Sequence, residues 1–250
     1  MSRSGCARTK ARANVHDQQN QQDKQDKQDQ QDQQDQQGRQ TPAERYAHVR
    51  WIGGSPCSGK TSIADALAAA HHGVAYHFDR MEPRHIARSD AATNPELMAF
   101  LALDMEQRWL LRPPAEMARN TLASWWARFP LVLDDLGALP TDAPIFAEGP
   151  GLFPELVAPL LASPHQALWL VTTEPFCLLV RQRRGGAYLE TSDPARSLRN
   201  IVARDVLLAR HVEREASARG LTWYAVDGGR SLSEMAALAE QHFALYLADR

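Results

Sequence analysis

Gly54-Ser55-Pro56-Cys57-Ser58-Gly59-Lys60-Thr61 is the stretch that decides the fold, because it fits the pattern G-x-x-x-x-G-K-[ST] at every fixed position. The two glycines allow a backbone loop to wrap an anion with its N–H groups directed inward. The lysine then reaches the β- and γ-phosphates of a nucleotide, and the threonine hydroxyl ligates Mg²⁺. The stretch therefore predicts a phosphate-binding loop.

The residues on either side of the loop support this interpretation. Residues 46–53 (YAHVRWIG) are typical of a short buried strand, and residues 61–71 (TSIADALAAAH) predict an Ala-rich helix. The N-terminus of such a helix and the loop amides converge on one phosphate group. Lys60 is also the only lysine after residue 40. We therefore interpret the match as functional rather than as a chance match in a Gly/Ser-rich turn.

The first part of the chain has a different composition from the rest. Residues 14–40 are rich in Gln and Asp, with Asp at every third position over residues 23–35. This period fits neither a helix face nor a strand face, and the segment contains almost no apolar residues to offset its ordering entropy. We expect residues 1–40 to be a disordered tail and residues 41–250 to form one α/β domain.

Composition narrows the class of protein. The net charge of −2 argues against nucleic acid as the main substrate, and no apolar run approaches membrane-spanning length. Cys6, Cys57 and Cys177 form neither a disulfide framework nor a paired metal-ligand spacing, which favours a cytoplasmic protein. Cys57 lies inside the loop, where a helix N-terminus lowers thiol pKa values. Of the two interpretations, a regulatory thiol and a small loop filler, we favour the filler.

Strand-like runs alternate with helical patterns from residue 41 onward. This alternation implies a mainly parallel sheet that is covered on both faces. Asn94, Asp193 and Ser231 are expected helix N-caps. The expected strands are 47–53, 74–78, 144–147, 167–171 and 222–226, and the expected helices are 61–71, 95–112, 114–126, 152–161, 175–184, 194–219 and 231–248.

Two segments compete for the strand that ends in a Mg²⁺-coordinating acid. One is residues 131–135 (LVLDD), and the other is residues 144–148 (PIFAE). Only eight residues separate them, whereas parallel neighbours need a crossover of a dozen or more. We therefore predict a helix over 130–139 and the strand over 144–148. Asp134 and Asp135 are then expected at a solvated helix edge.

Carboxylates at strand ends are the first site candidates, because ligands bind beyond the carboxyl ends of parallel strands. Asp79 is placed to accept a proton from a substrate hydroxyl or to help hold Mg²⁺; the alternative is a loop cap or a pair with Arg80. Glu148 is placed to orient a Mg²⁺-bound water or to contact substrate, and the alternative is a structural ion pair. We expect His77 to be a packed strand residue, and His85 is a weaker acid–base candidate.

An arginine cluster is the next candidate. Arg181, Arg183 and Arg184 end a predicted helix before two glycines, which suits a lid that closes over phosphates. The alternative is a solvated helix C-terminus, where arginine is favoured by the helix dipole. Three more arginines are further candidates for the same site or for the acceptor side: Arg199, Arg204 and Arg128. The Arg204–Asp205 pair has a surface position as its alternative.

Together, the segments GGSPCSGKTS (53–62), HFD (77–79), IFAEG (145–149), RQRR (181–184) and VDGGRS (226–231) resemble the P-loop small-molecule kinases. That superfamily includes shikimate, gluconate, nucleoside monophosphate and antibiotic-modifying kinases. The resemblance covers residues 46–248, and only the phosphate loop is a specific match. It implies a three-layer P-loop NTPase fold with a five-stranded parallel sheet in the order 2-3-1-4-5. An acceptor-side helical insertion over 80–142 and a lid over 174–195 are also implied.

By position, the resemblance assigns the nucleotide and Mg²⁺ to the loop. The expected nucleotide-binding residues are Gly54, Ser55, Pro56, Cys57, Ser58, Gly59, Lys60, Thr61 and Ser62. The expected catalytic residues are Lys60, Asp79, Arg181 and Arg184, and the expected metal ligands are Thr61 and Glu148. The resulting hypothesis is an ATP- and Mg²⁺-dependent phosphotransferase with a small-molecule acceptor. The alternatives are an ATPase switch, a nucleotide-binding module without turnover, and a kinase of nucleic-acid ends.

Overall fold

The structure is a computed structural model, and it describes residues 40–247. The predicted tail over residues 1–40, Cys6 included, lies outside the described residues except for its last position. The short helix α2 (Pro42–Arg45) belongs to a first unit, and a second compact unit begins at Tyr46. Among the described helices, none is both long and apolar enough to cross a membrane.

The second unit is built on one parallel sheet. Its strands are β1 (Val49–Gly54), β2 (Val74–His77), β3 (Ile145–Glu148), β4 (Ala167–Thr172) and β5 (Trp223–Val226). They lie in the order β2-β3-β1-β4-β5, and every neighbouring pair is parallel. This confirms the predicted α/β class and strand order. The three central strands are buried along their whole length, while the edge strands β2 and β5 are partly exposed.

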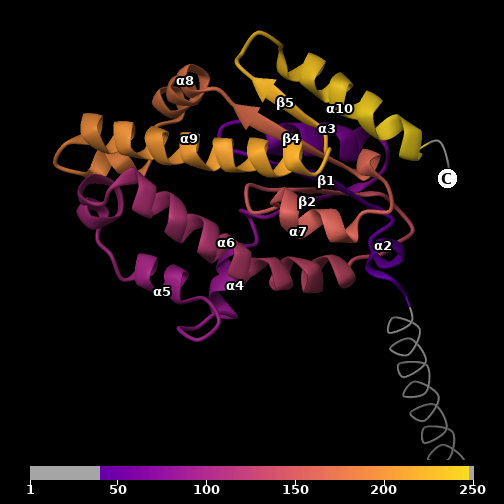
Figure 1. The fold of residues 1–250 in the computed structure, drawn as a ribbon, viewed down its shortest axis with the longest axis horizontal. Helices are drawn as coiled ribbons and strands as arrows, with labels where there is room; N and C mark the ends of the chain where they lie inside the picture. Colours follow the sequence, from indigo (N-terminus) through magenta and orange to yellow (C-terminus); the bar gives the residue numbers. More distant parts are fainter. Residues whose placement is uncertain (1–39, 248–250) are drawn as a thin grey trace, which may run out of the picture. The chain divides into compact units, whose positions relative to one another are not determined.

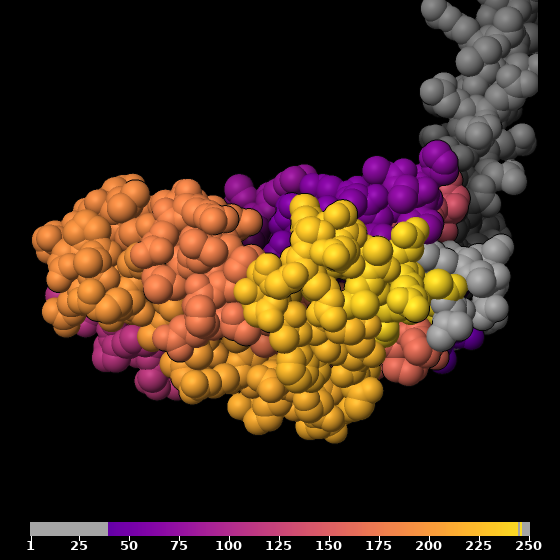
Figure 2. Space-filling view, turned by 90° about the horizontal axis from the view of Figure 1, so that it is seen from above, coloured from indigo at the N-terminus to yellow at the C-terminus, as the bar shows by residue number. Residues whose placement is uncertain are grey.

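Helices cover both faces of the sheet (Figure 1). Successive strand residues point to opposite faces, so Trp51 packs in one cluster and Ile52 in the other. The Ile52 face is covered by α3 (Lys60–Ala70) and α10 (Leu232–Leu247), and the Trp51 face by α6 (Pro114–Gly137), α7 (Pro154–Val157) and α9 (Pro194–Ala218). In the space-filling view, the yellow C-terminal segment with α10 adjoins the orange segment that contains α8 (Glu174–Arg184) (Figure 2).

The remaining elements are short. They are α4 (Glu82–Ala87), α5 (Pro95–Leu101), the π-helix η1 (Gln107–Leu111) and the 3₁₀ turns η2 (Ala158–Leu160), η3 (Pro164–Gln166) and η4 (Ala187–Glu190). The expected N-caps are confirmed, since Asn94 and Asp193 accept backbone N–H bonds and Ser231 forms a capping box with Glu234. The sequence did not predict α4, and it predicted one helix over 152–161 where the structure has α7 followed by η2.

Two predicted helix boundaries are wrong, each for a local reason. The expected helix over 95–112 is interrupted, because the Asp104 carboxylate accepts the Gln107 N–H at 2.8 Å and caps a new helical segment, η1. Conversely, the expected helices over 114–126 and 130–139 are one helix, α6, which continues through Pro130. Pro130 lies on the exposed face, where water can satisfy the carbonyl group that loses its N–H partner.

Gly54 generates the first testable prediction. Its φ of 129° is one that L side chains rarely adopt, and a Cβ there would overlap the backbone of Leu170 in β4. We expect Gly54→Ala to lower the free energy of unfolding by about 3 kcal/mol or more, measured by denaturant titration. Gly220→Ala is the matched control, because its φ is 64° but no heavy atom lies within 4 Å of the added Cβ. That variant should lose only about 1 kcal/mol, and equal losses in both would contradict the close-approach explanation.

Candidate functional site

The phosphate loop connects β1 to α3 and is fastened to the end of β4. Thr172 Oγ1 lies 2.7 Å from Ser55 Oγ and donates to the Pro56 carbonyl at 2.6 Å. Because the Thr172 hydroxyl has only one proton and donates it to Pro56, the Ser55 hydroxyl donates to Thr172 Oγ1. Ser55 Oγ in turn accepts the Thr172 N–H at 2.8 Å. These bonds hold Ser55 and Pro56, at the start of the loop, against the end of β4.

Lys60 lies inside the curve of the loop. Its ammonium donates to the Ser55 carbonyl at 2.6 Å and contacts Ser58 Oγ at 3.1 Å, and the residue is buried. Burial lowers the pKa of Lys60, and the nearby Glu148 and Asp79 carboxylates oppose that shift. Among the described residues it is the only lysine. Its positive charge is therefore held where the motif requires it, over the phosphate loop.

Thr61 and Glu148 come together at the base of the loop. Thr61, in the first turn of α3, donates its hydroxyl to Glu148 Oε1 at 3.2 Å. Glu148 is the last residue of β3, is buried, and lies in register with Ile52 of β1. A hydroxyl and a carboxylate oxygen are the hard ligands that Mg²⁺ prefers. The donor set at this point therefore fits Mg²⁺.

The strand that carries the acid is also settled by the structure. The segment 144–148 contributes β3, as predicted, while Asp135 belongs to α6. Of the two competing acids, Glu148 is thus the one at a strand end, beside the phosphate loop.

His77 has a larger part in this geometry than the sequence indicated. It is buried at the end of β2, as expected of a packed strand residue, but both ring nitrogens face carboxylates. Nδ1 lies 2.9 Å from Glu148 Oε1, and Nε2 lies 3.0 Å from Asp65 Oδ1 on α3. His77 therefore fixes the orientation of the Glu148 carboxylate. The signal that could have indicated this contact is the position of both residues at the ends of neighbouring parallel strands, where His77 lies in register with Glu148.

Most of the predicted site residues line one cavity of about 270 Å³. Asp79, exposed just after β2, lies on its wall together with Arg181 and Arg184 of α8. The loop and helix residues on the same wall are Pro56, Cys57, Ser58, Gly59, Lys60, Thr61 and Ser62, and Glu148 lines it as well. Gly54 and Ser55 support the loop from behind. Arg183 and Arg199 are exposed and do not line the cavity.

Asp205 joins two of the candidate arginines. Arg181 donates from Nε and Nη2 to Asp205 Oδ2, at 3.0 and 2.7 Å, and Arg204 does the same to Oδ1 at 3.0 and 2.7 Å. The carboxylate is 2% exposed, so a surface position for the Arg204–Asp205 pair is wrong. Arg181 and Arg204 both line the cavity in fixed orientations, whereas Arg184 on the same wall is exposed.

Asp135, His85 and Arg128 form a second buried network rather than a part of the site. Asp135 is not at a solvated edge, because its carboxylate accepts from Tyr76 Oη at 3.0 Å and contacts His85 Nε2 at 2.9 Å. Arg128 donates to His85 Nδ1 at 3.3 Å and to the Phe78 carbonyl at 2.9 Å. These contacts hold α4 and α6 against the end of β2. They exclude His85 and Arg128 as substrate contacts in this arrangement.

A second cavity, also of about 270 Å³, adjoins the first. It lies among α5, η1 and α6, and Trp125 and Arg204 line both cavities. Its wall combines three aromatic rings, three arginines and two carboxylates: Phe100, Trp109, Trp125, Arg108, Arg112, Arg204, Glu82 and Glu96. Sequence reasoning assigned an acceptor side to residues 80–142 and named Arg204 as a candidate, but it identified none of the other side chains, because no motif connects them.

The sequence matches no protein-family model and no curated protein. Among solved structures, the chain is similar to an uncharacterized protein from Eubacterium ventriosum, at 11% identity and a TM-score of 0.40, over 79% of this chain and 98% of that one. It is also similar to shikimate kinase from Acinetobacter baumannii in complex with shikimate, at 16% identity and a TM-score of 0.37, over 81% of this chain and 94% of that one. Both TM-scores are low, so the function is inferred below from the geometry of this chain.

The His85 network generates a pH prediction. Burial, and then the positive charge of Arg128, lower the pKa of His85 from its ordinary 6.5, although Asp135 opposes them. The unfolded chain therefore takes up a proton near pH 6.5 while the folded chain does not, so stability is lost as the pH falls below 6.5. Between pH 7.5 and 5.5 the wild type should lose more unfolding free energy than His85→Gln, which has no imidazole to titrate at this position. Denaturant titrations at both pH values measure the difference, and equal losses would contradict the neutral imidazole.

Proposed function

We propose that this chain is an ATP- and Mg²⁺-dependent phosphotransferase that acts on a small-molecule acceptor. The observation that carries the proposal is the pair of adjoining cavities that share Trp125 and Arg204. The first, which we call the nucleotide cavity, is lined by the phosphate loop. The second has no phosphate-binding motif of its own. An enzyme that moves a phosphoryl group between two molecules needs such a pair of sites, whereas a simple ATPase needs only the first.

On the nucleotide side, each residue has a distinct task. The loop amides and the Lys60 ammonium would hold the phosphate chain, as the motif requires. Thr61 and Glu148 would hold Mg²⁺, and His77 keeps the Glu148 carboxylate in place by its bond at 2.9 Å. When bound, Mg²⁺ neutralises charge on the phosphate oxygens. Since phosphoryl transfer requires little covalent chemistry from the protein, this positioning is the main catalytic contribution.

Arginines supply positive charge to the wall of the nucleotide cavity. Arg181 and Arg204 together carry two positive charges against the single negative charge of Asp205, to which both are bound. Arg184 adds a further charge from an exposed position on the same wall. We assign the fixed pair to orientation of the phosphates and Arg184 to closure over the transferring group. This is the lid function that the sequence suggested for the end of α8.

On the acceptor side, Asp79 lies on the wall of the nucleotide cavity and would accept the proton of the acceptor hydroxyl. The acceptor would occupy the second cavity, whose volume of about 270 Å³ restricts it to a small molecule. The cavity wall offers rings for stacking and both signs of charge. Each of these arginines already has a partner in the structure: Arg108 donates to the Phe100 and Leu101 carbonyls, Arg112 to Glu116 and Arg204 to Asp205. A cytoplasmic location, with its supply of ATP, agrees with the low cysteine content.

The lysine provides the direct test. We expect Lys60→Ala to reduce phosphoryl transfer by at least about 100-fold, because one preorganised positive charge on the phosphates is removed. The protein is incubated with γ-labelled ATP and a fractionated metabolite extract, and the label is followed into new products. Arg183→Ala is the control, because Arg183 is exposed at the end of α8 and does not line the nucleotide cavity. An unchanged rate in folded Lys60→Ala would refute the kinase, and hydrolysis of ATP without any acceptor product would favour an ATPase.

Neighbouring arginines on α8 give a second, more local prediction. Arg184 lines the nucleotide cavity and Arg183 does not, although both are exposed at the same helix end. We expect Arg184→Ala to weaken ATP binding about tenfold, through the loss of one charge-assisted hydrogen bond, and Arg183→Ala to change it less than about twofold. Isothermal titration calorimetry with ATP and Mg²⁺ measures both. Equal effects of the two substitutions would show that the end of α8 acts only through its overall charge.

A further inference from the structure

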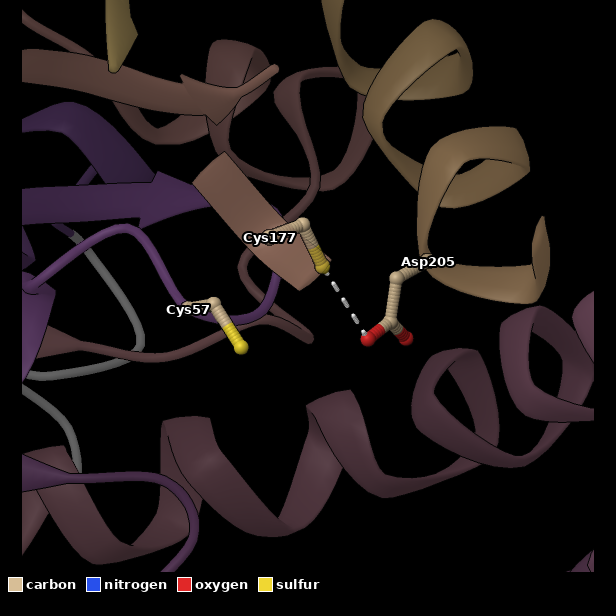
Figure 3. Close-up of side chains that lie close together, drawn as sticks. All are labelled: Cys57, Cys177 and Asp205. Carbon is tan, nitrogen blue, oxygen red and sulfur yellow. Dashed lines mark hydrogen bonds between the residues drawn. The ribbon is translucent and has the colours of Figure 1, made fainter. Parts of the chain in front are cut away.

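Two cysteines from distant parts of the chain face each other at the edge of the nucleotide cavity. Cys57 belongs to the phosphate loop, and Cys177 belongs to α8. Their sulfur atoms and a carboxylate oxygen of Asp205 all lie within 4.8 Å of one another, and Figure 3 shows the three side chains directed into one space. The Cys177 thiol donates to Asp205 Oδ2 at 3.7 Å. Asp205 holds Arg181 and Arg204 in the phosphotransferase proposed above, but the two thiols have no part in the transfer itself.

The two sulfurs differ in access and in acidity. Cys57 is partly exposed and lines the cavity, whereas Cys177 is buried. The neighbouring Cys177 thiol and then the charges of Arg181 and Arg184 lower the pKa of Cys57 to about 7, against the effects of burial and of Asp205. The pKa of Cys177 is raised by the neighbouring Cys57 sulfur, by burial and by Asp205. Near neutral pH, a substantial fraction of the partly exposed Cys57 is therefore thiolate, while Cys177 stays protonated.

The backbone at Cys57 is a separate sign that its side chain is not simple filler. Its φ is 66°, in the left-handed region that favours glycine. A cysteine in this conformation places its thiol toward α8 at a conformational cost that glycine would avoid. The interpretation of Cys57 as a small loop filler does not account for that cost.

A metal ion is the competing occupant of this cluster. Both oxygens of Asp205 already accept hydrogen bonds from arginines, Oδ2 from Arg181 and Oδ1 from Arg204. A cation would have to displace these bonds and would lie beside two guanidinium groups that repel it. The same positive charges stabilise a thiolate anion. The electrostatics of the cluster thus favour thiol chemistry over metal binding.

We propose that Cys57 is an oxidation site for hydrogen peroxide and that Cys177 converts the oxidised form into a Cys57–Cys177 disulfide. In the first step the Cys57 thiolate attacks peroxide, the O–O bond breaks, and sulfenic acid and hydroxide form; the hydroxide takes up a proton to give water. In the second step Cys177 attacks the sulfenic sulfur, an S–S bond forms and the S–O bond breaks. Asp205 accepts the Cys177 proton and passes it to the departing hydroxide. Overall, two thiols and one peroxide give one disulfide and two waters.

The disulfide would act on the phosphate loop. An S–S bond is about 2.05 Å long, so its formation draws residue 57 and α8 together by at most about 3 Å from their present separation. The loop would then be tethered across the cavity that it lines, beside Arg181 and Arg184. We infer that the oxidised chain binds nucleotide phosphates weakly and that reduction restores binding. This consequence, unlike the disulfide itself, rests on the proposed function.

The experiment uses the full chain with Cys6→Ser, so that Cys57 and Cys177 are the only cysteines. The protein is treated with hydrogen peroxide at pH 7.5, and intact mass and non-reduced peptide maps are recorded before and after dithiothreitol. We expect loss of two hydrogen masses, a 57–177 crosslinked peptide and full reversal. ATP titrations of the reduced, oxidised and re-reduced protein should show at least tenfold weaker binding in the oxidised form only.

Single substitutions assign the steps. With Cys177→Ser, or with Cys177→Ala if the serine variant does not fold, a sulfenic acid should persist at Cys57 and be trapped by dimedone. With Cys57→Ser, no dimedone adduct should form at Cys177.

Several results would overturn the inference. They are no crosslink in folded protein, first oxidation at Cys177, or purified protein that contains stoichiometric zinc and resists peroxide. A disulfide that leaves ATP binding unchanged would overturn the regulatory part. Reduced protein that does not bind ATP would instead refute the proposed function, because the mass and peptide-map results do not depend on it.

Discussion

The hydrogen bond between the Thr61 hydroxyl and the Glu148 carboxylate joins the first turn of α3 to the end of β3, and the site is arranged around it. It requires β3 to lie beside β1, which the parallel pairing of the two strands provides. His77 reaches the same carboxylate oxygen from β2, on the other side of β3. Residues from β2, β3 and α3 therefore meet at a single carboxylate. Its exclusion from water increases the strength of each of these polar contacts.

Residues close together in the sequence were the predictable part of this structure. The phosphate loop follows from a local pattern and the choice of β3 from the length of a crossover, while the strand order was implied by the family resemblance. Asp135, His85 and Arg128 were misjudged because their partners lie 43 to 59 positions away. Asp135 was expected at a solvated edge, and His85 and Arg128 were expected at the site; only the packing of α4 and α6 on β2 shows that the three satisfy one another. The predicted break between two helices before Pro130 was wrong, because an exposed helix face tolerates a proline that a buried face would not.

The second cavity illustrates a different limit of sequence reasoning. Its wall is assembled from α5, η1 and α6, with Arg204 reaching in from α9. Arg204 lies over the Trp109 ring at 5.5 Å while it is bound to Asp205, so one residue connects this wall to α8. Such a set has no spacing that a pattern could detect. It becomes visible only when the folded chain brings together five separate segments, since Glu82 of α4 also lines the wall.

The π-helix η1 gives the wall of the second cavity a capacity to change that the phosphate loop lacks. A turn of this kind holds one residue more than an α-helical turn, and such turns are frequent at functional sites. Removal of that residue would rotate the side chains that follow by about 100° about the helix axis. Trp109 would then leave its place on the cavity wall, whereas β1, β3 and the phosphate loop lie outside the altered segment. In the phosphotransferase proposed above, a one-codon deletion in this turn would be an evolutionary route to a new acceptor.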